Sequence, residues 1–221
     1  MKKITFLLAV ALGSAFAFTS CNETKEKKNE TEEVAQAEAT ATTYKVNTEK
    51  SVIKWSGSKP TGTHTGTISL VTGEIMVNDK AIEAGNFTVN MNSIKVTDLE
   101  AGDGKENLEA HLMGTVEGKE GDFFNVNKYP TATFELTGVE MTDGKNIIKG
   151  NLTIKDKTNN VSFPAAVSYA GDNMTLNSEK FTIDRTQWDV NYGSKSVFDN
   201  LGDKFISDDM QLQVTLQAAK M

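Results

Sequence analysis

The sequence has little of the chemistry that most enzymes and metalloproteins use. Cys21 is its only cysteine, so no disulfide can form within the chain. His64 and His111 are its only histidines, and they stand on separate segments without the H-E-x-x-H spacing of a zinc site. We expect each histidine in a loop or a hydrogen bond rather than as a metal ligand. No metal and no cofactor are predicted.

Motifs for catalysis and for phosphate binding are equally scarce. The sequence has no G-x-S-x-G nucleophile elbow, and no serine has an obvious histidine partner. Gly57 to Gly62 has the glycine spacing of a phosphate loop, but Thr63 and His64 stand where a lysine and a hydroxyl residue would contact the phosphates. Nothing in these motifs therefore argues for a catalytic site, and a triad of residues far apart in the sequence is left open.

Positive charge is also in short supply. The chain has 23 Lys and Arg residues against 30 Asp and Glu residues, which gives a formal net charge of -7. An excess of negative charge attracts neither nucleic acid nor anionic lipid headgroups. Nucleic acid is therefore not expected as a partner.

The N-terminus has the features of an export signal. Two lysines near the start are followed by an apolar or small stretch from Ile4 to Phe18, which is too short and too early for a transmembrane helix. One interpretation is ordinary cleavage at Ala15-Phe16-Ala17, which leaves a free thiol at Cys21. The segment also resembles a bacterial lipoprotein signal, which implies that residues 1–20 are removed and that Cys21 is lipidated on sulfur.

The composition changes after Cys21. Residues 22–43 consist almost wholly of Glu, Lys, Thr, Ala and Asn, with no aromatic residue. Such a stretch cannot bury enough apolar surface to order itself. Residues 21–43 are therefore predicted to be a lipidated N-terminus and a disordered tether that holds a domain away from a membrane. Residues 44–221 are long enough for one domain with a sizeable core.

Alternating apolar and polar residues predict β-strands in most of residues 44–221. From Met210 to Ala218 every second side chain is apolar, so one face of this strand is dry and the other is wet. Turn residues such as Thr142-Asp143-Gly144 separate these runs at hairpin spacing, which predicts antiparallel connections. A long antiparallel sheet hides its edges by closing on itself or by doubling over, so we expect an all-β fold such as a barrel of about eight strands.

One segment of the domain has a helical pattern instead. Asp103 can cap a helix, Glu106 follows three residues later, and Gly114 is placed to end it. We therefore expect one short helix near residues 104–113.

Residues 122–134, DFFNVNKYPTATF, resemble the signature D-F-F-x-V-x-x-Y-P-x-x-x-F of the lipid- and polyisoprenoid-binding YceI-like family. Five other segments agree in the right order: Ser51–Trp55, Asn92–Val96, His111-Leu112, Gly150–Ile154 and Ile183–Arg185. The departures from the family pattern, at Lys155-Asp156 and Trp188-Asp189, stand at turns or strand ends. The resemblance covers residues 44–218.

The resemblance implies a single extended, lipocalin-like antiparallel barrel. Its interior would hold a long-chain isoprenoid, a quinone or another apolar lipid outside the cytoplasm, as a binding protein rather than an enzyme. An anchor at Cys21 would place the protein in the cell envelope, facing the periplasm. Asn22 is not the aspartate that typically keeps lipoproteins in the inner membrane, which favours the outer membrane. The expected partners are this lipid and the membrane, and a homodimer is left open.

An eight-stranded barrel is just wide enough to hold one apolar ligand or to be filled by its own side chains. Alternation alone does not choose between these arrangements. For a ligand in the lumen, the predicted contacts are Ile53, Trp55, Phe123, Phe124, Phe134, Leu136, Leu152, Ile154, Phe163, Phe181, Ile183 and Arg185. Phe123 and Phe124 are neighbours, so in a strand only one of them can point inward.

Arg185 differs from the other predicted contacts because a guanidinium inside a barrel needs a partner. One interpretation is that it binds carbonyls or an acidic residue at the barrel end. The other is that it holds the polar head of the bound lipid, in which case Arg185→Met would reduce lipid retention with the fold intact.

Three functions therefore stay open. The first is a carrier, storage or sequestration protein for a lipid. The second is a solid barrel that acts as an interaction or envelope-stress module, whose lumen its own Phe, Met and Trp side chains would fill. The third is a lipid-modifying enzyme, for which the sign would be His64 or His111 beside an acidic residue at the barrel mouth.

Overall fold

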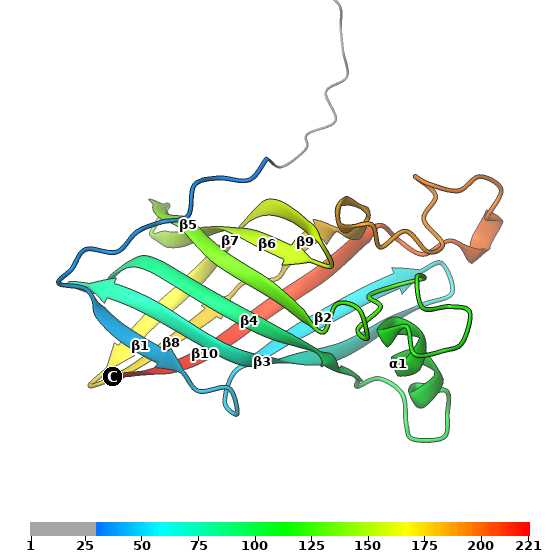
Figure 1. The fold of residues 1–221 in the computed structure, drawn as a ribbon, viewed down its shortest axis with the longest axis horizontal. Coiled ribbons are helices and arrows are strands. Elements are labelled where there is room, and N and C mark those ends of the chain that lie inside the picture. Colours follow the sequence, from blue (N-terminus) through cyan, green and yellow to red (C-terminus); the bar gives the residue numbers. More distant parts are fainter. Residues whose placement is uncertain (1–29) are drawn as a thin grey trace, which may run out of the picture.

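A computed structural model describes residues 30–221. The predicted signal peptide, residues 1–20, and the predicted lipidation site, Cys21, lie outside the described residues. Ten strands form one antiparallel sheet (Figure 1). The strands are β1 (Thr42–Val46), β2 (Val52–Lys59), β3 (Gly62–Asn78), β4 (Ala81–Val96), β5 (Thr131–Thr142), β6 (Lys145–Ile154), β7 (Lys157–Ala170), β8 (Asn173–Ser178), β9 (Phe181–Asp184) and β10 (Asp209–Lys220).

The sheet closes into a ring because β10 pairs with strands from both ends of the order. It pairs with β2 on one side and with β8 and β9 on the other. Strands β1 and β2 lie end to end along β10, with Val46 opposite Ala218 and Val52 opposite Thr215. Strands β8 and β9 follow one another along β10 in the same way. The ten strands thus occupy eight positions, which confirms the predicted all-β barrel of about eight strands.

The barrel is elongated because its central strands are long. Strand β3 has 17 residues and β4 has 16, which at about 3.4 Å per residue corresponds to roughly 55 Å of extended chain. Its interior holds two clusters of buried apolar residues, one including Trp55 and Val96 and the other including Ile75 and Met174. Phe134 and Phe181 pack against both clusters and so lie at the boundary between the two halves of the lumen.

The helix α1, Lys105–Met113, confirms the predicted helix near residues 104–113. It ends at Gly114, whose φ of 71° lies in the left-handed region that glycine adopts without strain. Asp103 is not its cap. The N-cap residue is Gly104, and the Glu106 carboxylate accepts a hydrogen bond from the N–H of Gly102 at 3.1 Å.

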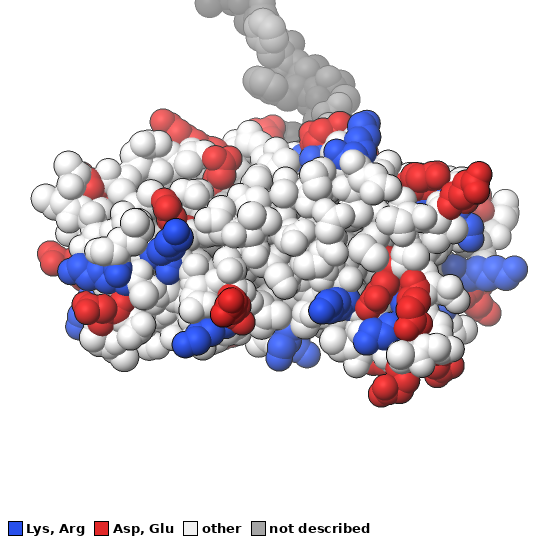
Figure 2. Space-filling model, turned by 60° about the horizontal axis from the view of Figure 1, so that its bottom comes forward, with Lys and Arg blue, Asp and Glu red and all other residues white. Residues whose placement is uncertain are grey.

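Helix α1 lies beside one end of the barrel, which we call the mouth (Figure 1). In the space-filling view, charged side chains of both signs are scattered among uncharged ones, and Asp and Glu gather near the end that carries α1 (Figure 2). Two 3-10 helices, Arg185–Trp188 and Gly202–Lys204, flank the long loop between β9 and β10. Within residues 30–221, no helix is long and apolar enough to cross a bilayer.

Residues 30–41 follow the outside of the barrel (Figure 1). The N–H of Ala35 donates to the carbonyl of Leu136 at 2.9 Å. The side-chain amide of the buried Asn151 accepts from the N–H of Glu32 at 3.0 Å and donates to its carbonyl at 2.7 Å. These contacts hold the segment against β5 and β6.

The course of residues 30–43 differs from the disordered tether predicted for residues 21–43. Strand β4 pairs with β5 only between Asn86–Asn90 and Thr131–Glu135, so β5 has a free edge beyond Glu135. An exposed strand edge offers unpaired N–H and C=O groups. A segment with little apolar surface can therefore be ordered by backbone hydrogen bonds to this edge, and β1 begins at Thr42.

Candidate ligand cavity

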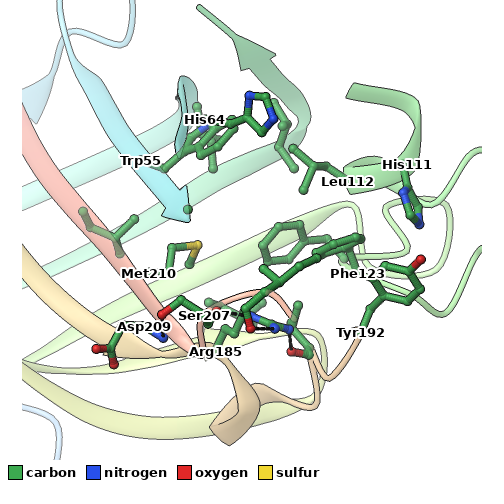
Figure 3. Close-up of a pocket in the computed structure, with 18 of the residues that line it drawn as sticks. Trp55, His64, His111, Leu112, Phe123, Arg185, Tyr192, Ser207, Asp209 and Met210 are labelled. Carbon is green, nitrogen blue, oxygen red and sulfur yellow. Dashed lines mark hydrogen bonds between the residues drawn. The ribbon is translucent and has the colours of Figure 1, made fainter. Parts of the chain in front are cut away.

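A cavity of about 390 Å³ occupies the mouth half of the barrel (Figure 3). Its walls come from strands β2 to β6 and β10, from α1 and the loop after it, and from the segment between β9 and β10. Most lining side chains are apolar, among them Trp55, Met91, Leu112 and Met210. We call this space the mouth cavity.

A second, smaller cavity of about 100 Å³ lies deeper in the barrel. Every residue that lines it is apolar or glycine, and we call it the inner cavity. Ile53, Val89, Leu152 and Leu212 line both cavities. The two spaces are therefore neighbours along one lumen, and a polar group in the inner cavity would have no hydrogen-bond partner from a side chain.

Four phenylalanines from β4, β5, β7 and β9 line the inner cavity as a continuous layer. The ring centroids of Phe87 and Phe134 are 6.1 Å apart, those of Phe134 and Phe163 are 5.9 Å apart, and Phe163 stacks on Phe181 at 4.4 Å. A Cβ at Gly150 would lie 2.1 Å from Cζ of Phe134, so only glycine leaves room for this ring. The layer is thus fixed in place by the neighbouring strand.

Two histidine–aspartate pairs lie at the mouth. Nδ1 of His64 is 2.8 Å from the Asp98 carboxylate, and Nε2 of His111 is 2.6 Å from the Asp122 carboxylate. Both histidines line the mouth cavity. The expectation that each histidine takes part in a hydrogen bond agrees with this geometry, although His64 lies on β3 and His111 on α1 rather than in loops.

The surroundings of the two pairs differ. Asp98 also accepts a hydrogen bond from the N–H of Thr65 at 2.7 Å. Burial alone would raise the pKa of Asp98, but the hydrogen bonds from Thr65 and His64 outweigh burial and hold this pKa below its usual value. The His111 ring packs edge-on against Phe123 and Tyr192, with both centroid distances at 5.0 Å.

Arg185 lies in the cavity wall, but its guanidinium is occupied by the loop before β10. Nε donates to the carbonyl of Ser207 at 2.9 Å, Nη2 donates to that of Ile206 at 3.1 Å, and Nη1 donates to that of Val190. The Asp208 carboxylate lies 3.6 Å from Nη2. Burial lowers the pKa of Arg185, opposed by the nearby negative charge of Asp208. This geometry agrees with the interpretation in which Arg185 binds backbone carbonyls at the barrel end.

Ten of the eleven predicted apolar contacts line the lumen. The mouth cavity is lined by Ile53, Trp55, Phe123, Phe124, Leu152 and Ile154, and the inner cavity by Ile53, Phe134, Leu136, Leu152, Phe163 and Phe181. Ile183 lines neither cavity; it is buried in the wall beneath an outer groove, and its pairing partner Met210 lines the mouth cavity. That any of these residues binds a ligand stays a prediction.

Phe123 and Phe124 both line the mouth cavity, which alternation in a strand would not allow. They lie in the loop after α1 rather than in a strand. The backbone there is tied to the helix by hydrogen bonds such as that from Phe124 N–H to the Leu112 carbonyl at 3.1 Å. The rule of alternating faces therefore does not apply, and both rings can turn inward.

Several lining residues are absent from the predicted set. Leu108 and Leu112 on α1 had a sequence signal, because they fall on one side of the predicted helix. Val190, Tyr192 and Ile206 come from the loop before β10 and had none. That loop has no periodic pattern, and it reaches the cavity only because the chain returns to β10 at the mouth.

A closed antiparallel barrel with an apolar lumen that opens at one end defines a class of internal-cavity proteins. The family model of the YceI-like domain matches residues 44–218. The chain belongs to this YceI-like family.

Relatives and solved structures agree with this assignment. A UPF0312 protein of Pseudomonas aeruginosa is 36% identical over 85 residues, a match that covers only 38% of that protein and 38% of this chain. BcnA of Burkholderia cenocepacia is similar in structure, with a TM-score of 0.60, 21% identity, and 79% of this chain and 99% of that chain covered. A polyisoprenoid-binding domain from Saccharophagus degradans gives a TM-score of 0.56 at 12% identity, with 80% and 98% covered. At these identities the structures show the fold.

The bonds of Arg185 predict a structural effect of its removal. Arg185→Met leaves three carbonyls without their donor, which we expect to cost about 3 kcal/mol or more. The amides of Ile206 and Ser207, which bond Gly193 and Ser58, should then exchange faster with deuterium.

Lys155→Met is the matched control for this experiment. Its ammonium donates to a single loop carbonyl, that of Asp189, at 2.8 Å, so its removal should leave the exchange of the Ile206 and Ser207 amides nearly unchanged. If Arg185→Met keeps normal stability and exchange, Arg185 does not hold the loop.

Proposed function

We propose that this protein is an extracytoplasmic, membrane-tethered lipoprotein that binds a long-chain isoprenoid or a related apolar lipid in its barrel. Binding serves to carry, store or sequester the lipid. The observation that supports this most is the pair of neighbouring apolar cavities, one of which is lined by no polar side chain. The mouth cavity lies in the size range of small-molecule sites.

The energetics favour an apolar chain over other ligands. A chain that enters the lumen gains about 25 cal/mol for each Å² of apolar surface removed from water. Polar or charged ligand groups would lose their hydration in the inner cavity without a side-chain partner there. The ligand therefore enters with its apolar end first, and any polar head stays at the mouth beside Lys59, His64 and His111.

The alternative of a solid barrel has less support. It requires a lumen filled by the protein's own large side chains. Trp55, Phe134 and Met210 line the cavities rather than closing them. This arrangement favours a ligand in the lumen over an interaction module with a filled core.

A lipid-modifying enzyme remains the second candidate, and the histidine–aspartate pairs at the mouth favour it. An aspartate that orients an imidazole is one element of general-base catalysis. Among residues 30–221, however, no serine or threonine hydroxyl forms a hydrogen bond with His64 or His111. We therefore keep binding as the proposed function.

The first prediction concerns the ligand itself. The full chain with Cys21→Ser, which removes the anchor, is purified from a bacterial periplasm without detergent, and an organic extract is examined by mass spectrometry. We expect one long-chain apolar lipid in near-stoichiometric amount, because the lumen offers a dry site. A clean extract, with no uptake of added isoprenoid alcohols, would contradict lipid binding.

The second prediction concerns the anchor. In the wild-type chain the mature N-terminal peptide should carry two acyl groups on Cys21, and the protein should fractionate with membranes. Cys21→Ser, with the signal cleaved at Ala15-Phe16-Ala17, should move it to the soluble periplasmic fraction, because neither the acyl groups nor the apolar stretch remains. Asn22→Gln is the neighbouring control and should stay with the membranes. An unmodified thiol at residue 21 of the wild type would rule out the anchor.

The third prediction concerns ligand length. Phe134→Leu shortens the side chain at the boundary between the two halves of the lumen, so the mouth and inner cavities should merge. Isoprenoid alcohols of increasing length are offered to the purified protein. The variant should retain longer chains than the wild type, at a stability cost of about 1 to 2 kcal/mol.

Phe198→Leu makes the same chemical change on the surface, where Phe198 is 48% exposed. It should leave the length preference unchanged. An identical length profile for Phe134→Leu and the wild type would show that the phenylalanine layer does not limit the ligand.

A further inference from the structure

The exposed apolar side chains are unevenly distributed over the described residues. Six large apolar residues are exposed: Val71, Met141, Tyr192, Val197, Phe198 and Met221. Three of them, Tyr192, Val197 and Phe198, lie on the loop between Val190 and Ser207. The other three lie on β3, on the β5–β6 hairpin and at the C-terminus. Single exposed apolar residues need no explanation, whereas three within residues 192–198 of one loop are a candidate interaction surface.

The loop holds these side chains outward in a defined way. Its base is closed by the hydrogen bond from Ile206 N–H to the Gly193 carbonyl at 2.8 Å and by the bonds of Arg185. Ser194 has no exposed surface, and its carbonyl accepts from the N–H of Phe198 at 2.9 Å. The exposure of Phe198 therefore results from an ordered loop.

The same loop forms part of the mouth. Val190, Tyr192 and Ile206 line the mouth cavity, and Tyr192 is also one of the exposed residues. Figure 3 shows Tyr192 beside Phe123 and His111 at the edge of the cavity. Apolar surface thus continues from the cavity wall to the outside of the protein.

Charge distinguishes the two sides of the mouth. Residues 195–204 carry Lys195 and Lys204 against Asp199 and Asp203, so this side is neutral overall. Residues 98–122, which include α1, carry eight acidic residues and two lysines, and Figure 2 shows acidic side chains at this end. Anionic lipid headgroups would repel the α1 side, while the neutral apolar side can enter the interface between headgroups and acyl chains.

We propose that residues 192–205 dock the mouth onto a phospholipid bilayer. Val197 and Phe198 enter the interfacial layer, Tyr192 lies at its edge where it contacts His111 of α1, and the acidic residues of the α1 side are turned away from the membrane. A ligand that passes between bilayer and lumen in this state leaves the acyl chains without crossing bulk water. The route of the ligand rests on the proposed function, whereas docking itself can be measured on the protein without added ligand.

The test measures flotation of the full chain with phosphatidylcholine vesicles. Every variant carries Cys21→Ser, so that the anchor does not contribute. Phe198→Ser should lower the fraction of protein bound to vesicles about tenfold, because the side chain that enters the membrane changes from phenylalanine to a polar one. Met141→Ser should have no effect, because Met141 is 68% exposed but lies on the hairpin at the end of the barrel opposite the mouth (Figure 1).

Vesicle composition gives an independent check. Replacing part of the phosphatidylcholine with phosphatidylglycerol should weaken binding at low ionic strength, and added salt should restore it, because the α1 side is acidic. If the chain with Cys21→Ser alone does not float, or if the added Phe198→Ser leaves its flotation unchanged, the docking proposal is overturned.

The failure of docking and the failure of lipid binding give different results. If the Cys21→Ser chain carries lipid in its extract but does not float, only the docking proposal is overturned. If the Cys21→Ser chain floats, and floats less after Phe198→Ser, but gives a clean extract, docking is supported and the proposed lipid binding is contradicted. Phe198 contributes to neither cavity, so its substitution should leave the lipid content of the purified protein unchanged.

Discussion

The pairing of β10 with strands from both ends of the sheet is the interaction on which the rest of this structure depends. Strand β10 contacts β1 and β2 along one edge and β8 and β9 along the other. Without it the sheet would have two open edges, and the lumen would be a solvated groove. Because β9 pairs with the start of β10, the loop that joins them must return to the mouth. Arg185 then binds the returning chain at Val190, Ile206 and Ser207.

Glycine and aromatic residues on neighbouring strands leave the lumen partly empty. Trp55 lies opposite Gly66, and a Cβ there would be 2.4 Å from its ring. Phe87 lies opposite Gly73, and Phe134 covers Gly150. In each case the ring lies over a glycine, in the space that a larger side chain at the glycine position would otherwise fill. Because the rings fill the wall positions, the centre of an eight-position barrel keeps room for cavities.

The sequence predicts those parts of the structure that obey a period. Alternation predicts the strands and eight lumen side chains, and the glycine at residue 114 predicts the end of α1 correctly. Alternation fails where the chain is not a β-strand, as at Phe123 and Phe124, which both face the cavity from the loop after α1. Ile183 shows another limit, because alternation identifies a buried face but does not distinguish a packed wall from a cavity wall.

Hydrogen bonds between distant segments account for the remaining differences. Residues 30–41 have too little apolar surface to order themselves, and no composition rule reveals that β5 offers a free edge beyond Glu135. The partners of Arg185 are backbone carbonyls, which every residue has, so no sequence motif could identify them. Likewise, His64 and Asp98 are 34 residues apart and meet only because β3 and β4 pair.

The polar groups of the mouth do not reach the inner cavity. His64 and His111 are hydrogen-bonded to Asp98 and Asp122, and the guanidinium of Arg185 binds the loop, so these three side chains already have partners. A dianionic head would find Lys59 and Lys204 at the rim but would also meet the acidic α1 side. A neutral head has no such conflict. On the proposed function, the mouth therefore discriminates by charge and the lumen by length.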